Sequence, residues 1–129
     1  MALENVKLSV PAEADYARSV RMLAATLAVS DDLSVDDVED VRMAAEEGFV
    51  YACSTSPERC DVSFTLGEGT VAMDFVLGSG AVDVDGSGEN EEQLELVELL
   101  LSAICDEFEV SDQEGIPTLH LLKKAAHVE

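Results

Sequence analysis

The sequence has few aromatic residues, few cysteines and no tryptophan. Aromatic side chains make up 5% of its 129 residues, and the three cysteines are Cys53, Cys60 and Cys105. They show neither a C-x-x-C spacing nor a His-rich partner motif, and an odd number cannot close into a complete disulfide framework. We therefore expect no disulfide scaffold and no zinc site, but reduced and mostly buried thiols.

Long apolar runs are also missing. No segment approaches the roughly 20 consecutive apolar residues that a membrane-spanning helix needs. Residues 1–5 lack the basic start and the apolar stretch of a secretory signal. The sequence therefore predicts no membrane association, no targeting segment and a cytoplasmic location.

Basic residues are scarce. Seven Lys and Arg stand against 28 Asp and Glu, which gives a formal net charge of -21. Such a charge repels the phosphates of nucleic acids and anionic membrane surfaces, so we expect neither as a partner. Two interpretations of the charge stay open: it attracts a basic protein partner, or it serves only solubility and adaptation to a salty cytoplasm.

Apolar residues make up 47% of the chain, enough for a core at a length typical of one domain. We predict a single domain over residues 1–129. Alternation of apolar and polar residues predicts five strands. They fall at about residues 5–10, 61–66, 71–75, 108–110 and 118–122. The turn Gly67-Glu68-Gly69 joins the second and third as a hairpin.

Apolar residues at helical spacing predict three helices. The first starts near Asp15, and the second follows a capping-box-like Ser34 and ends before Pro57. The third covers about residues 94–104, after a glycine-rich loop expected over 78–90 and before a turn at about 113–115.

The third helix is unusually apolar. The residues at helical spacing are Leu94, Val97, Leu101 and Ile104, and Leu96, Leu99 and Leu100 widen the apolar stripe to most of the circumference. We expect this helix to be largely buried or to present its excess apolar face to a partner. The run 99–101 is explained by core packing or, if part of it is exposed, by dimerisation.

The element order is strand, helix, helix, strand, strand, loop, helix, strand, strand. Each helix needs a sheet face to cover its apolar stripe. The order predicts an α+β fold, a two-layer sandwich of a mostly antiparallel mixed five-stranded sheet with three helices on one face.

This layout and the segment Arg42-Met43-Ala44-Ala45-Glu46-Glu47-Gly48-Phe49-Val50-Tyr51-Ala52 resemble the anti-sigma factor serine kinases and their relatives in the histidine-kinase-like ATPase superfamily. The similarity covers roughly residues 5–125. It implies the histidine-kinase-like ATPase fold, a nucleotide pocket, and a sigma factor or an anti-sigma antagonist as partner.

The family's helix motif E-x-x-x-N places a general base and a magnesium-binding Asn on one helical face. Here Glu47 matches the acid, but Tyr51 stands where the Asn should be. A phenol that is protonated at neutral pH is a poor ligand for magnesium.

Two further boxes of the family also differ. Leu77-Gly78-Ser79-Gly80 lacks the Asp that would hold the adenine amino group. The segment 91–96 has no glycine where the family's glycine-rich loop approaches the phosphates, and it adds three carboxylates there. These departures predict a degenerate nucleotide site.

From this resemblance we expect an anti-sigma-like regulatory domain that binds a basic protein partner and is not an enzyme. Its vestigial pocket comprises Glu47, Tyr51, Leu77, Gly78 and Gly80, with Glu47 the remnant of a catalytic base, and we expect no cofactor and no metal. One alternative is a divergent serine/threonine kinase that binds ATP and magnesium. The other is a structural or oligomerisation module, such as a homodimer.

Overall fold

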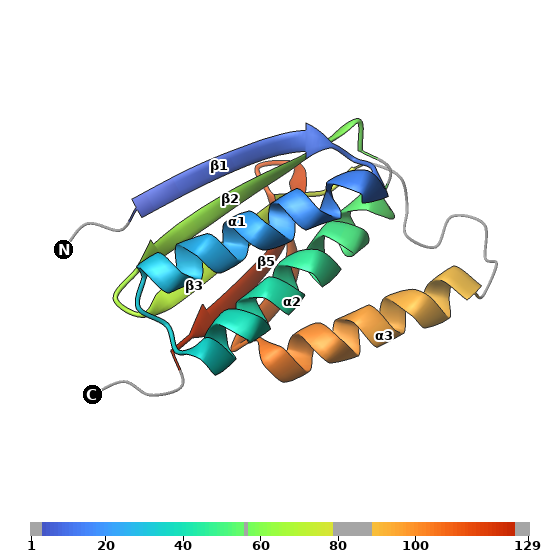
Figure 1. The fold of residues 1–129 in the computed structure, drawn as a ribbon. Helices are drawn as coiled ribbons and strands as arrows, with labels where there is room; N and C mark the ends of the chain where they lie inside the picture. The colour runs from blue at the N-terminus through green and yellow to red at the C-terminus, as the bar shows by residue number, and fades with distance from the viewer. Residues whose placement is uncertain (1–3, 56, 79–88, 126–129) are drawn as a thin grey trace.

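The computed structural model describes residues 4–55, 57–78 and 89–125, which form one antiparallel sheet with helices over one face (Figure 1). The strands are β1 (Glu4–Pro11), β2 (Arg59–Gly67), β3 (Thr70–Val76), β4 (Glu107–Gln113) and β5 (Ile116–Lys124). The helices are α1 (Ala17–Ser30), α2 (Val35–Cys53) and α3 (Glu89–Ile104), and a 3-10 turn (Ala14–Tyr16) precedes α1.

The sheet has the strand order β1-β2-β3-β5-β4. The predicted α+β class with a five-stranded sheet and three helices is confirmed, but the expected mixed sheet is wrong for the described residues. All four neighbouring pairs are antiparallel. Strands β3 and β4 run in the same direction, and they would form the parallel pair if β5 did not lie between them.

Strand β2 shows why this sheet has one buried face. Cys60, Val62, Phe64 and Leu66 are buried beneath the helices, while the residues between them point to the open face. This alternation is the period that the sequence shows, because successive side chains of a strand point to opposite faces. The core therefore lies between the sheet and the helical layer.

The predicted start of α2 is confirmed. The Ser34 hydroxyl accepts a hydrogen bond from the backbone N–H of Asp37 at 3.2 Å, and Asp36 and Asp37 lie in the first turn. The Ser34 hydroxyl satisfies an N–H group of the first turn, and the two carboxylates stabilise the positive end of the helix dipole. The first helix begins at Ala17, later than expected, because residues 14–16 form the 3-10 turn.

Two contacts fix α2 over the middle of the sheet. At Gly48, a Cβ atom would lie 2.6 Å from Cε1 of Phe75, so only glycine allows this close approach. At the other end of the helix, the Lys123 ammonium on β5 lies 3.0 Å from Oδ2 of Asp40 and 3.9 Å from Oδ1 of Asp37. Burial lowers the pKa of Lys123, but the hydrogen bond to Asp40 and the nearby carboxylates outweigh it, and the net pKa is raised.

Helix α3 is only partly buried, so the first of its two expectations, a largely buried helix, is wrong, and the second, an apolar face presented to a partner, stays a prediction. Leu101 is fully buried, and Val97 and Ile104 pack against the core as predicted. Leu96 and Leu99, however, are 66% and 67% exposed. The reason is position: α3 lies at the side of the helical layer, so only one of its faces meets the core (Figure 1).

The loop expected over 78–90 lies mostly outside the described residues, and its end differs from the expectation because α3 already begins at Glu89. The hairpin turn at 67–69 and the turn at 113–115 are confirmed, with Glu68, Gly69, Glu114 and Gly115 at positive φ. None of the helices in the described part of the chain has the length and hydropathy of a membrane-spanning segment.

The contact between Gly48 and Phe75 makes a stability prediction. We expect Gly48→Ala to lower the free energy of unfolding by about 1–3 kcal/mol, because overpacking exceeds the roughly 0.5–1 kcal/mol gained in helix propensity. Urea unfolding measures this change. The same substitution made in a Phe75→Leu background should cost less, since the clashing ring atoms are gone. An equal cost in both backgrounds would show that Phe75 is not the obstacle.

Candidate functional site

The residues singled out by the resemblance lie around the second half of α2 and the end of β3. Tyr51 and Leu77 are 5% and 7% exposed and belong to the hydrophobic core, and Glu47 is half-buried one turn before Tyr51. The backbone N–H of Gly78 donates to the Thr55 hydroxyl at 2.7 Å, which ties the end of β3 to the end of α2. Gly80 lies outside the described residues.

The electrostatics around Tyr51 do not fit a magnesium nucleotide. Burial raises the pKa of Tyr51, and the charge of Glu98 on α3 raises it further. Burial likewise raises the pKa of Glu47, with a smaller contribution from Glu46. The phenol therefore stays neutral and donates no charge to a cation, and the carboxylates around it repel phosphates. We derive no catalytic step through these residues.

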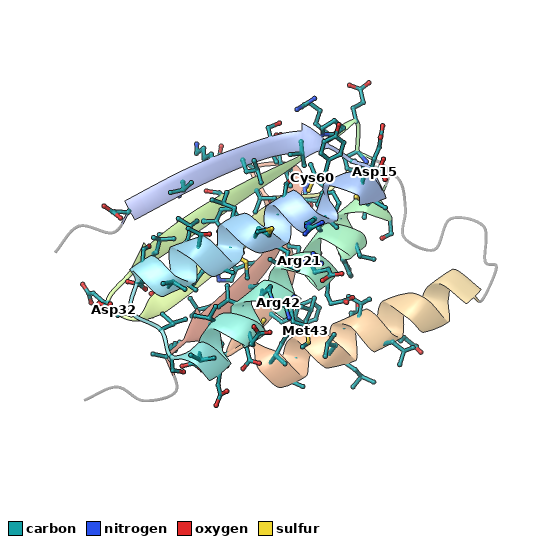
Figure 2. All side chains as sticks on the ribbon, in the orientation of Figure 1. Asp15, Arg21, Asp32, Arg42, Met43 and Cys60 are labelled. Atoms are coloured by element: carbon teal, nitrogen blue, oxygen red, sulfur yellow. The ribbon has the colours of Figure 1, made fainter. Side chains whose placement is uncertain are left out.

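Helices α2 and α3, beside this region, carry 11 of the 28 acidic residues and one of the seven basic ones. The α2 sequence contains six acidic residues and one Arg, and the α3 sequence contains five acidic residues and no basic one. Nη2 of Arg42 lies 2.6 Å from Oε1 of Glu39 in an ion pair, and Nη1 of Arg21 lies 3.1 Å from Oε1 of Glu46. Figure 2 labels the two arginines, Arg21 on α1 and Arg42 on α2. Both cations are thus already engaged with α2 carboxylates, and α3 has none of its own.

A shallow groove of about 370 Å³ runs between α3 and β4. Glu95, Glu98, Leu99 and Ser102 line it from α3, and Phe108 lines it from β4. Apolar carbon and carboxylate oxygen are therefore exposed side by side. Such a surface can take an apolar side chain that is flanked by positive charge.

The open face of the sheet carries a second polar cluster. Five register partners form one row across all strands: Lys7, Ser63, Asp74, His120 and Glu109. His120 Nδ1 lies 2.7 Å from Oδ1 of Asp74 in this row, and its Nε2 lies 3.2 Å from Oε1 of Glu107, which is outside the row and opposite Leu122. The imidazole thus bridges carboxylates from the two strands that flank β5.

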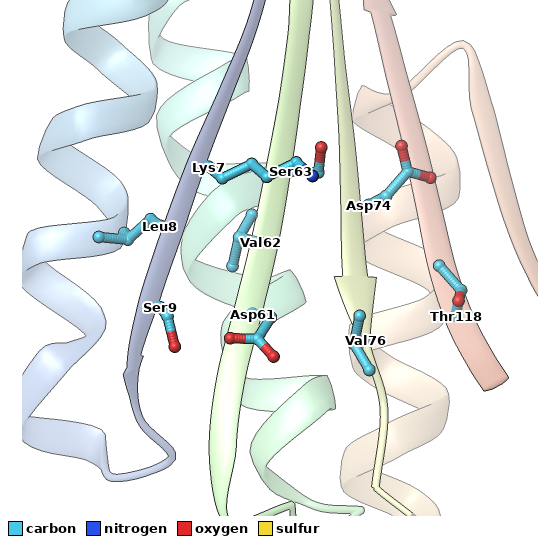
Figure 3. A pocket seen from close by; sticks show the side chains of 9 residues that line it. All are labelled: Lys7, Leu8, Ser9, Asp61, Val62, Ser63, Asp74, Val76 and Thr118. Carbon is cyan, nitrogen blue, oxygen red and sulfur yellow. The ribbon is translucent and has the colours of Figure 1, made fainter.

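A hollow of about 570 Å³ lies beside this row, on strands β1, β2, β3 and β5 (Figure 3). Figure 3 shows Lys7 reaching across toward Ser63, with Asp61 and Asp74 on the same face. The lining mixes hydroxyl groups, carboxylates and an ammonium group. The hollow therefore presents both signs of charge.

Sequence reasoning missed the grouping of His120, Asp74 and Glu107. Strand alternation places Asp74 and His120 on outward faces of their own strands. Which strands are neighbours follows only from the sheet order, in which β5 separates β3 from β4. The sequence therefore indicated on which face of the sheet Asp74 and His120 lie, but not that these two residues are neighbours.

The cysteines are free thiols. Burial raises the pKa of Cys60 to about 12 and that of Cys105 to about 11, and it also raises the pKa of Cys53. The thiolate is the reactive form, so all three are poor nucleophiles at neutral pH.

Comparison of the sequence with models of known protein families finds no match, and comparison with curated proteins also finds none.

The His120 cluster makes stability depend on pH. Burial lowers the pKa of His120, but the hydrogen bonds and charges of Asp74 and Glu107 outweigh it, and the net pKa is raised above 6.5. A raised pKa in the folded state stabilises the protein below about pH 6.5, and this contribution is lost as the pH rises through the folded-state pKa. We expect the stability difference between the protein and its His120→Gln variant to be larger at about pH 6 than at about pH 8.

An NMR titration of the His120 imidazole tests whether Asp74 raises its pKa. Asp74→Asn should lower its pKa, while Asp61→Asn, a change on the same face but outside the hydrogen bonds of His120, should lower it less. A pKa at or below about 6.5 in the unmodified protein would contradict the assignment.

Proposed function

We propose that this protein is an anti-sigma-type regulatory domain with the histidine-kinase-like ATPase fold, which binds and sequesters a basic protein partner such as a sigma factor without catalysis. One observation carries the proposal: eleven acidic residues and a single Arg lie along the sequences of α2 and α3. That single Arg, Arg42, is paired with Glu39.

The charge supports the binding of a basic protein in two ways. A net charge of -21 attracts a cationic partner over a distance and raises the rate of encounter at low salt. Carboxylates on α2 and α3 then face the partner at close range, where charge complementarity fixes orientation and discourages wrong partners. The same charge opposes a homodimer through α2 and α3, because like charges would meet.

The surroundings of Tyr51 support the non-catalytic part of the proposal. The resemblance places a magnesium-binding Asn at this position, whereas Tyr51 is packed in the core and its pKa is raised by burial and by Glu98. A nucleotide would bring further negative charge to this region. The kinase alternative therefore requires both a different metal ligand and a different charge pattern.

Titration calorimetry with ATP and ADP, with and without magnesium, tests the non-catalytic part. We expect no binding tighter than about 1 mM, in either the protein or its Glu47→Ala variant, because nothing on α2 replaces the missing ligand. Magnesium-dependent nucleotide binding with a micromolar Kd, weakened in the Glu47→Ala variant, would restore the kinase interpretation.

Surface plasmon resonance with purified sigma factors from the same genome tests the partner. We expect one of them to bind, with an association rate that falls when salt rises from about 0.05 to 0.2 M.

A matched pair of variants locates the effect. Asp36→Asn with Glu95→Gln removes two exposed charges from α2 and α3, and Asp61→Asn with Glu109→Gln removes two from the open face. The first pair should slow association about two- to fivefold, and the second pair less. Binding of no sigma factor would overturn the proposal, and equal slowing would remove its assignment to α2 and α3.

A further inference from the structure

Helix α3 carries apolar residues on two sides, and the half-buried Leu100 lies between them. The inner stripe, Val97, Leu101 and Ile104, packs on the core. A second set, Leu96, Leu99 and Ala103, follows at spacings of three and four residues, so it also lies along one side of the helix. We call this second set the outer stripe of α3.

All members of the outer stripe are exposed, Leu96 and Leu99 by 66% and 67%. Single exposed leucines are ordinary on protein surfaces, but a continuous ridge on one helix is typical of a contact surface. The inner stripe already provides what α3 needs to dock on the core. Packing of this domain therefore gives no reason for the outer one.

Carboxylates border this ridge. Glu95 and Glu98 follow the same helix side as the groove toward β4, and that groove includes Leu99, Ser102 and Phe108. Leu99 belongs to both features, so ridge and groove form one continuous surface. Among the described residues of α3 there is no Lys or Arg to neutralise its acids.

The apolar ridge and the carboxylates beside it determine which kind of partner can bind to this surface. A second copy of the chain would bring Glu95 and Glu98 against their own counterparts with no cation between them, in a molecule of net charge -21. A helix with apolar residues on one face and Lys or Arg at its borders satisfies both the ridge and the carboxylates. We propose that the outer stripe of α3 and the α3–β4 groove bind a basic amphipathic helix of the protein partner.

The proposal rests on the proposed function for the identity of the partner. The surface itself determines the spacing of apolar and basic residues in the bound helix. Apolar side chains of that helix at i, i+3 or i+4, and i+7 contact Leu96, Leu99 and Ala103, and one of them enters the groove beside Phe108. Basic side chains at its border pair with Glu95 and Glu98. Apolar contact then governs the dissociation rate, and charge governs mainly the association rate.

The test uses a defined probe, a synthetic amphipathic helical peptide of about 20 residues with Leu along one face and Lys or Arg on both borders. Fluorescence polarisation measures its affinity for the full chain. We expect Leu96→Ser with Leu99→Ser to weaken binding at least tenfold, which corresponds to about 1.4 kcal/mol. A peptide with Glu in place of every Lys and Arg should not bind.

The matched control is Met22→Ser with Val29→Ser on α1, which removes an apolar pair of similar exposure elsewhere in the helical layer. It should change affinity less than twofold. Chemical shifts of the unmodified protein give a second readout that needs no variant: on addition of the peptide, residues 95–103 and Phe108 should shift most. Equal losses in both double variants, or shifts centred on another element, would overturn the proposal.

Two further results separate this proposal from the function on which it rests. A sigma factor that binds the Leu96→Ser, Leu99→Ser variant as tightly as the unmodified protein overturns the docking surface and leaves the function standing. If the peptide binds as expected but no sigma factor does, the surface stands and the partner is another basic protein. A dimer in light scattering that this variant converts to a monomer would assign the outer stripe to a second copy instead.

Discussion

Helix α2 lies against the sheet with no side chain between its backbone and the ring of Phe75, because residue 48 is glycine. That contact fixes the rotation of the helix about its own axis. Ala44, Ala45 and Ala52 then face the core. Met43 and Val50 face outward. Because the glycine faces the sheet, most acidic side chains of α2 lie on the sides of the helix that do not contact the sheet. Helices α1 and α3 pack on either side of α2.

The parts of the fold that follow from local periodicity were predictable. Alternation fixed the buried face of β2, and the hydroxyl of Ser34 marked the start of α2. Arrangement in space was not predictable to the same degree, because a sequence pattern does not say which strands are neighbours. The position of β5 between β3 and β4 removed the expected parallel pair and created the bridge from Asp74 through His120 to Glu107. Similarly, the composition of α3 showed excess apolar surface, but only its place at the side of the layer decided which leucines would meet water.

The two faces of the molecule differ in electrical character. On the open face of the sheet, Lys7, Arg59, His120 and Lys124 alternate with carboxylates, so positive and negative groups interleave. In the helical layer, the sequences of α2 and α3 are overwhelmingly acidic. The negative charge is therefore denser along α2 and α3 than on the open face of the sheet. Under the proposed function, this charge attracts a cationic partner more strongly to α2 and α3 than to the open face.

The pairing of the first strand also affects the order of events during synthesis. Strand β1 is made first, yet its partners begin only at Arg59 on β2. While the ribosome adds the residues between them, the segment that becomes α1 and α2 can already form local helical contacts, whereas β1 has no strand beside it. Closing this long-range pair is slow compared with helix formation. The β1 segment thus has no partner strand until β2 has been made, and the alternating polar residues Asn5, Lys7 and Ser9 limit its tendency to pair with other chains during that interval.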